Sequence, residues 1–133
     1  MRMRTWIVGL AALVLLSGCS AGPTPPDDDI TSITFSQYQA IENFDDSDYT
    51  QDDPEQLRRF AELLVEYDVV PGTTITTVED DCAGGLSSTV TVTYSESPAA
   101  DMFIATCGIP EFDDFNAQAN ELLSEWRSDL GGS

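Results

Sequence analysis

The sequence of 133 residues predicts a small α+β domain, in which two amphipathic helices pack on one face of an antiparallel sheet of about four strands. Three observations support this fold: short runs rich in β-branched and aromatic residues, two segments with apolar residues at helical spacing, and turn residues between them. The expected order of elements is β-α-β-β-β-α, in a single domain over residues 30–133.

Four segments combine β-branched or aromatic residues with alternating polarity, which is typical of strands. In the third segment, Val90 and Val92 point one way while Thr89 and Thr91 point the other, which predicts one buried and one wetter face. Glycines after the second segment and a looser turn after the third favour a three-stranded meander for the last three strands. The expected strands are Ile30–Phe35 and residues 73–79, 88–94 and 102–107.

Two segments repeat apolar residues at helical spacing and are expected to cover the sheet. In the first, Asp53 can cap the helix, Pro54 suits its first position and Gln56 can complete a capping box. This helix is expected to end near Val70-Pro71-Gly72, and the second helix is expected to end at Gly131-Gly132. The apolar stripe of the second helix, which is expected to join the core, consists of Phe112, Phe115, Ala119, Leu122, Leu123, Trp126 and Leu130.

The first 18 residues have the organisation of a secretory signal peptide. Arg2 and Arg4 precede an apolar run, Trp6–Leu16, which is too short for a membrane-spanning helix because such a helix needs about 20 residues. The run leads into Leu16-Ser17-Gly18-Cys19. Here the chain resembles the bacterial lipoprotein class, whose lipobox runs leucine, small residue, glycine, cysteine.

The resemblance implies that residues 1–18 are removed and that Cys19 carries acyl chains such as palmitate. Two acyl chains on one residue give stable membrane residence, so the expected location is the extracytoplasmic face of the cell membrane. The proline- and aspartate-rich segment 19–29 is then expected to be a disordered tether. The lysine-poor, aspartate-rich composition also looks like that of small actinobacterial lipoproteins or, as a second choice, of salt-adapted archaeal proteins, and this likeness implies no activity.

The mature chain is expected to be strongly acidic. Without residues 1–18, three arginines remain against 24 carboxylates, so the side chains carry a net charge of −21. No lysine and no histidine occur in the sequence. A basic patch for nucleic acid or for anionic lipid headgroups is therefore excluded, and cationic, neutral or apolar partners are expected.

The residue types limit the possible chemistry. The absence of histidine and lysine excludes Ser-His, Cys-His, Ser-Lys and Schiff-base systems, and no cofactor is expected. Only carboxylates remain, so a glycosidase-like envelope hydrolase is kept as an alternative. Acids in loops are solvated and acids at a helix start favour its dipole, and this interpretation is preferred. The acids that flank the cysteines or the second helix are Glu79, Asp80, Asp81, Glu111, Asp113 and Asp114.

The segment Asp45–Asp53 is dense in the oxygen ligands that calcium prefers. It departs from the helix-loop-helix calcium template, because a loop that starts at Asp46 has Gln51 where glycine is needed and Leu57 where the bidentate glutamate belongs. A solvated loop before a capped helix is therefore favoured. A calcium-binding surface protein stays open as an alternative.

Beyond the lipid site, the sequence holds two cysteines, Cys82 and Cys107, which lie 25 residues apart. In an oxidising compartment they are expected to form a structural disulfide, and their spacing does not match a redox-active Cys-x-x-Cys pair. Two strands separated by a third lie about 9.6 Å apart, which is too far for a disulfide. Either Cys82 reaches over the end of the sheet from its loop, or the second and fourth expected strands are neighbours.

The sequence as a whole favours a non-enzymatic domain that is tethered to a membrane and binds a ligand or supports an envelope assembly. A concave cleft with two close carboxylates and an aromatic ring would indicate the hydrolase instead. A flat apolar patch ringed by acids would indicate a surface for a partner.

Overall fold

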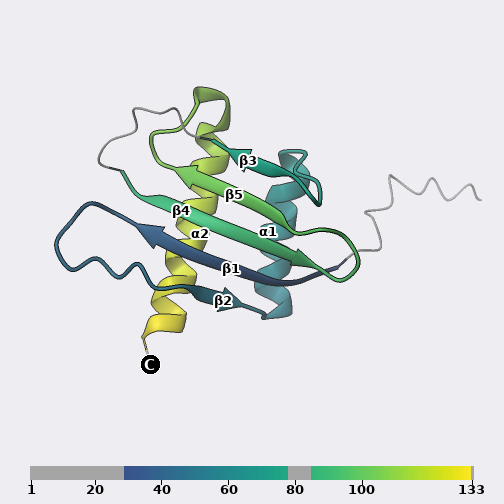
Figure 1. Ribbon diagram of the computed structural model, residues 1–133, viewed down its shortest axis with the longest axis horizontal. Coiled ribbons are helices and arrows are strands. Elements are labelled where there is room, and N and C mark those ends of the chain that lie inside the picture. Colours follow the sequence, from purple (N-terminus) through teal and green to yellow (C-terminus); the bar gives the residue numbers. More distant parts are fainter. Residues whose placement is uncertain (1–28, 78–84, 133) are drawn as a thin grey trace, which may run out of the picture.

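Figure 1 shows a computed structural model of the chain, in which residues 29–77 and 85–132 are described. The expected signal peptide, Cys19, Cys82 and nearly all of the expected tether lie outside these ranges. The elements, in chain order, are β1 (Ile30–Tyr38), β2 (Tyr49–Gln51), α1 (Pro54–Glu66), β3 (Thr74–Thr76), β4 (Ser87–Tyr94), β5 (Ala100–Ala105), a 3-10 turn η1 (Pro110–Phe112) and α2 (Asp113–Gly131).

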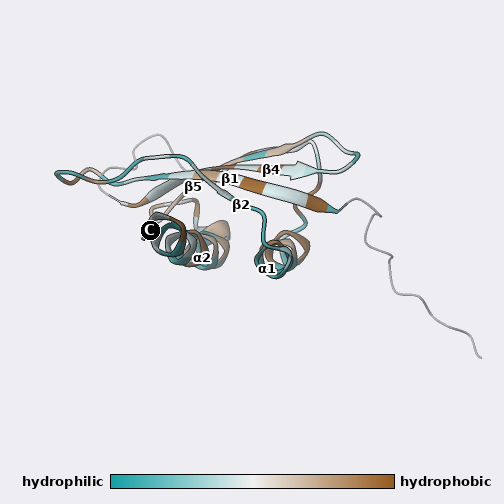
Figure 2. Cartoon of the chain, turned by 90° about the horizontal axis from the view of Figure 1, so that it is seen from below, coloured by the Kyte–Doolittle hydropathy of each residue, from teal (hydrophilic) through white to brown (hydrophobic). Residues whose placement is uncertain are grey.

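The strands form one five-stranded sheet in the order β2-β1-β4-β5-β3. Three of the neighbouring pairs are antiparallel, while β3 and β5 run parallel. Both helices lie against the same face of the sheet, as Figure 2 shows. The predicted α+β class is therefore confirmed, although the sheet is mixed and has one strand more than expected.

The expected three-stranded meander is wrong. In the described part of the chain β4 pairs with β1 on one side and with β5 on the other, so both of its edges are occupied. β3 joins the far edge instead, where Ile75 lies opposite Met102 of β5. The expected second and fourth strands are thus neighbours. Cys107 is not a free thiol, but Cys82 lies outside the described residues, so their pairing stays a prediction.

The N-terminal half contains more strand than the sequence pattern suggested. β1 continues beyond Phe35 because the polar Gln37 can be buried: its amide nitrogen donates to the hydroxyls of Ser88 and Ser124, each at 3.2 Å. The short β2 lies inside the segment expected to be a solvated loop. Its Tyr49 ring packs 5.8 Å from the ring of Phe35, which provides the apolar contact that holds this edge strand.

The start of α1 is confirmed, and its end is four residues or more earlier than expected. The Asp53 carboxylate accepts from the backbone N–H groups of Glu55 and Gln56, but the Gln56 side chain does not complete a capping box, because its oxygen accepts from the Trp126 indole N–H at 2.8 Å. Asp68 takes a left-handed conformation (φ 56°) just after the helix, and this closes a Schellman-type turn before Val70.

The second helix ends where expected, with Gly132 as its cap. Two residues of the expected apolar stripe are not buried. Phe112 belongs to the preceding 3-10 turn, so it departs from the helical stripe and is only half-buried. Leu130 is 37% exposed, because the last turn of α2 extends past the edge of the sheet (Figure 1). The other five stripe residues, Phe115, Ala119, Leu122, Leu123 and Trp126, are buried as predicted.

The core lies between the sheet and the two helices. At its centre the Trp126 ring of α2 packs 6.0 Å from the Phe35 ring of β1 and 5.9 Å from the Phe60 ring of α1. Val90 and Val92 of β4 are fully buried, whereas the threonines that alternate with them, Thr89, Thr91 and Thr93, face away from the helices, as the alternation predicted. One core therefore fixes both helices against the sheet and against each other.

Candidate functional site

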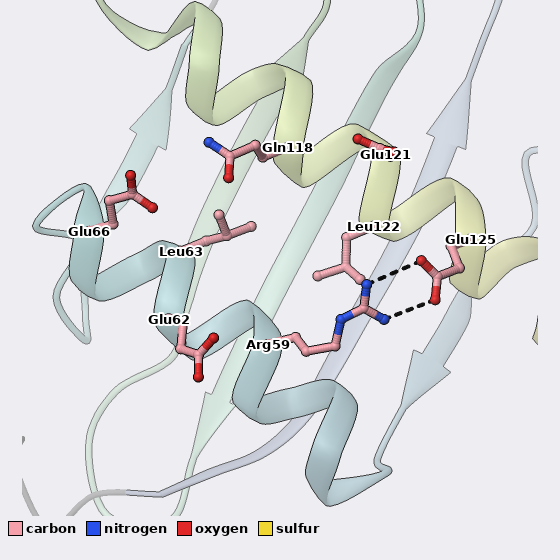
Figure 3. A pocket seen from close by; sticks show the side chains of 8 residues that line it. All are labelled: Arg59, Glu62, Leu63, Glu66, Gln118, Glu121, Leu122 and Glu125. Atoms are coloured by element: carbon pink, nitrogen blue, oxygen red, sulfur yellow. Dashed lines mark hydrogen bonds and ion pairs between the residues drawn. The ribbon is translucent and has the colours of Figure 1, made fainter.

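A groove of about 380 Å³ runs between α1 and α2 on the side of the helices that faces away from the sheet (Figure 3). Each helix contributes four side chains, and the two sets follow the same spacing of i, i+3, i+4 and i+7, which places them on one helical face. The lining residues are Arg59, Glu62, Leu63 and Glu66 from α1, and Gln118, Glu121, Leu122 and Glu125 from α2.

The floor of the groove is apolar. Leu63 and Leu122 point toward each other between the helices and are 8% and 6% exposed. They occupy the third place in each set of four, and the polar residues on either side of them form the walls. The helices run antiparallel, since Arg59 near the start of α1 meets Glu125 near the end of α2. Leucine therefore lies beside leucine in the middle, and polar groups close both ends.

One end of the groove is closed by an ion pair. Both terminal nitrogens of Arg59 donate to the Glu125 carboxylate, at 2.9 and 3.2 Å, and the first also donates to the Gln56 side-chain oxygen at 2.8 Å. The hydrogen bonds from Arg59 lower the pKa of Glu125, and the same contact raises the pKa of Arg59. Glu125 is thus held in its ionised form, as a fixed ion-pair partner and not as a proton donor.

The other end of the groove is closed by Tyr67 and Gln118. The Tyr67 ring packs 5.1 Å from the Phe115 ring, and its hydroxyl accepts from the Gln118 amide at 3.2 Å. Partial burial raises the pKa of the Tyr67 hydroxyl, and the negative charges of Glu66 and Asp114 raise it to a smaller extent. Tyr67 therefore stays neutral at physiological pH and positions Gln118 at the groove wall.

The walls carry a marked excess of negative charge, because four glutamates face one arginine. Glu125 is neutralised by Arg59, and Glu62 lies within ion-pair distance of Arg58 on the outer surface of α1. Glu66 and Glu121 remain on opposite walls beside the leucine floor. The groove therefore combines an apolar strip with acidic walls, the arrangement that suits a ligand with an apolar centre and cationic flanks.

Of the acids expected from the sequence to be of interest, the three in the described ranges, Glu111, Asp113 and Asp114, do not line this groove. Glu79, Asp80 and Asp81 lie outside the described residues. Glu111 belongs to η1, while Asp113 and Asp114 occupy the first turn of α2, and all three are exposed. The acids of the groove were missed, although a signal existed: glutamates flank a leucine at the same spacing in both helices.

The segment Asp45–Asp53 does not form one loop in the structure. Asp45 accepts hydrogen bonds from the backbone N–H and hydroxyl of Ser47 and from the Tyr49 hydroxyl, which together lower its pKa to about 2. Asp53 caps α1. Within residues 29–77 and 85–132, no three acidic or cysteine side chains converge at a distance suited to a metal ion.

Two further observations concern membrane-spanning helices and similarity to known proteins. Within the two described ranges, no helix combines the length and apolarity needed to cross a bilayer. Comparisons with protein-family models, curated proteins and solved structures gave no match.

Proposed function

We propose that the protein is a membrane-tethered extracytoplasmic lipoprotein whose domain is a non-enzymatic binding module, and that the groove between α1 and α2 takes a cationic amphipathic peptide segment. The observation that carries this proposal is the pairing of the Leu63 and Leu122 floor with glutamates on both walls. An amphipathic helix commonly binds by placing its apolar side chains into such a groove, while its flanking charges set the orientation.

The size of the groove fits a short segment. From Arg59 to Glu66 the wall rises by about 10 Å, or two helical turns. Two or three apolar side chains of a ligand can occupy this length, with lysine or arginine on each side to meet Glu66 and Glu121. The lining within the described residues holds two leucines and no aromatic ring, which favours a surface for a partner over a sugar-cleaving cleft.

The test uses the full chain, recovered from carbonate-washed membranes in nonionic detergent. A Cys19→Ser chain serves as the blank, because a chain without acyl groups is expected to be lost in the wash. The probe is a short fluorescent peptide of leucine and lysine with leucines at helical spacing, and its fluorescence anisotropy reports binding. The double variant Glu66→Gln, Glu121→Gln is expected to bind about tenfold more weakly, since each exposed ion pair contributes up to about 1 kcal/mol.

The matched control is Glu42→Gln, Asp46→Asn, which removes the same charge from the loop between β1 and β2. It should bind the peptide as the wild type does. Equal weakening by both double variants would show attraction to net charge alone and would contradict the groove. Retention of the Cys19→Ser chain on washed membranes would contradict the tether independently of peptide binding.

A further inference from the structure

The face of the sheet opposite the helices is open, and no described element lies over it (Figure 2). Strand alternation and the pairing register place one set of side chains on this face. Its exposed or half-buried positions are Thr50 of β2; Ser32, Thr34, Ser36 and Tyr38 of β1; Ser87, Thr89, Thr91 and Thr93 of β4; Asp101 and Phe103 of β5; and Thr74 and Thr76 of β3. We call this set the hydroxyl face.

The hydroxyl face is ordered by its own hydrogen bonds. The hydroxyls of Thr34 and Thr50 lie 3.2 Å apart across β1 and β2, and the Thr91 hydroxyl donates to the Asp101 carboxylate at 2.7 Å. These side chains also belong to residues paired directly across strands. The face thus presents hydroxyl groups at fixed strand spacing, so little side-chain freedom is lost when a ligand binds.

The charge of this face differs from that of the molecule. The mature chain carries −21, yet Asp101 is the one carboxylate among the face positions of the five described strands. An anionic polymer would be repelled by the whole molecule, and a cationic one would find more acids on the helices. A second copy would bring two strongly negative domains together over hydroxyls that provide little apolar burial. The face suits a neutral ligand.

Two aromatic rings stand on the hydroxyl face. Tyr38 is 56% exposed and Phe103 is 39% exposed. Tyr38 pairs with Ser87 of β4 and Phe103 pairs with Thr89, so the two rings are two strands apart and offset by two residues along the strands. Their Cα atoms therefore lie about 12 Å apart. Two different sugar rings of one oligosaccharide can span this separation. Each ring can stack on an aromatic face, and sugar hydroxyls can exchange hydrogen bonds with threonine and serine.

We propose that the hydroxyl face binds a neutral polysaccharide, with Tyr38 and Phe103 as stacking platforms and with Ser87 and Thr89, on the strand between them, as hydrogen-bonding partners. This site is separate from the groove. The groove is lined by α1 and α2, and both helices lie against the opposite face of the sheet (Figure 2). The proposal therefore does not depend on peptide binding.

The test is native electrophoresis of the full chain in nonionic detergent, through gels that contain glucomannan, laminarin, arabinogalactan or amylopectin. At least one of these neutral polysaccharides is expected to retard the wild type. Tyr38→Ala and Phe103→Ala should each weaken binding about tenfold, which is the scale of one aromatic stacking contact. Polygalacturonate, an anionic polysaccharide, should give no retardation.

Two controls separate the rings from general effects. Tyr38→Phe keeps the ring and should retain binding, and Val65→Ala removes an exposed apolar side chain from α1 and should also retain it. Melting temperatures of all variants verify that they fold. Absence of retardation by every neutral polysaccharide would overturn the proposal, as would alanine variants that bind like the wild type. A concentration-dependent dimer lost in Phe103→Ala would identify a second copy as the occupant and overturn it as well.

Discussion

The two faces of the sheet are built by the same strands but have opposite properties. Phe35 and Ile104 face the helices and are at most 1% exposed, while their neighbours Thr34 and Phe103 face solvent. The helices then carry glutamates on their outer surface, whereas the open face of the sheet carries hydroxyls. The acidic and the neutral surface are thus separated by the full thickness of a small domain, so the two ligands proposed above would not compete for the same surface.

The largest expected difference between the two faces concerns aromatic residues. Trp126→Ala removes the ring between sheet and helices and should lower the free energy of unfolding by about 3 to 5 kcal/mol. Phe103→Ala removes a ring from the open face and should change it by about 0.5 kcal/mol or less. Urea denaturation monitored by circular dichroism measures both. A cost above about 2 kcal/mol for Phe103→Ala would mean that the open face is part of the core.

A smaller difference is expected between adjacent residues of β1. Gln37 is 1% exposed and hydrogen-bonded to Ser88 and Ser124. Gln37→Leu should cost about 1 to 3 kcal/mol, because the Ser124 hydroxyl loses its side-chain partner while the Ser88 hydroxyl keeps only its bond to Asn120. Ser36→Ala, on the open face, should stay within about 0.5 kcal/mol of the wild type. The same denaturation experiment applies. Equal effects would contradict the alternation of faces along this strand.

The smallest effect concerns an exposed site at the edge of the sheet. The pKa of Asp45 is lowered to about 2 by its bonds to Ser47 and Tyr49, so folding favours its ionised form. Its contribution to stability is therefore present above pH 4 and is lost as pH falls toward 2. Asp45→Asn should lower the melting temperature by a constant amount from neutral pH to about 5, and the gap should close by pH 2.

The Tyr49→Phe background provides the control for this pH effect. It removes one donor to Asp45, so the gap between Asp45 and its asparagine variant should become smaller. Only the difference between paired variants is informative, because protonation of the other carboxylates also relieves charge repulsion over the same pH range. A gap that does not change with pH would contradict the assigned role of the carboxylate.

Local patterns in the sequence predicted the helices, the α+β class and the two-sided character of β4. They did not predict the strand order, because the partner of β3 is set by which edges remain open after β1, β4 and β5 have paired. β2 was missed because acids surround its three residues. The first strand was expected to end at Phe35, because the burial of the polar Gln37 depends on partners in β4 and α2 that lie far away in the sequence.

The candidate site was harder to predict than the fold. The acids expected from the sequence to be of interest were those that flank the cysteines or the second helix. The groove instead depends on which faces of two helices lie side by side, and these helices are separated by three strands in the sequence. Glu66 and Glu121 acquire a shared role only through the antiparallel packing that the core aromatic residues fix.

The position of β4 in the sheet has a consequence for folding. β1 pairs with β4, so Gln37 must meet Ser88 across 51 residues of chain, whereas the β4–β5 hairpin forms from residues close in sequence. Closing the longer loop costs more entropy before any contact compensates for it, and such topologies fold slowly. Because a chain is synthesised from its N-terminus, β1 stays without its partner β4 until that strand has followed. The hairpin of β4 and β5 then provides the template to which β1, and with it β2, is added.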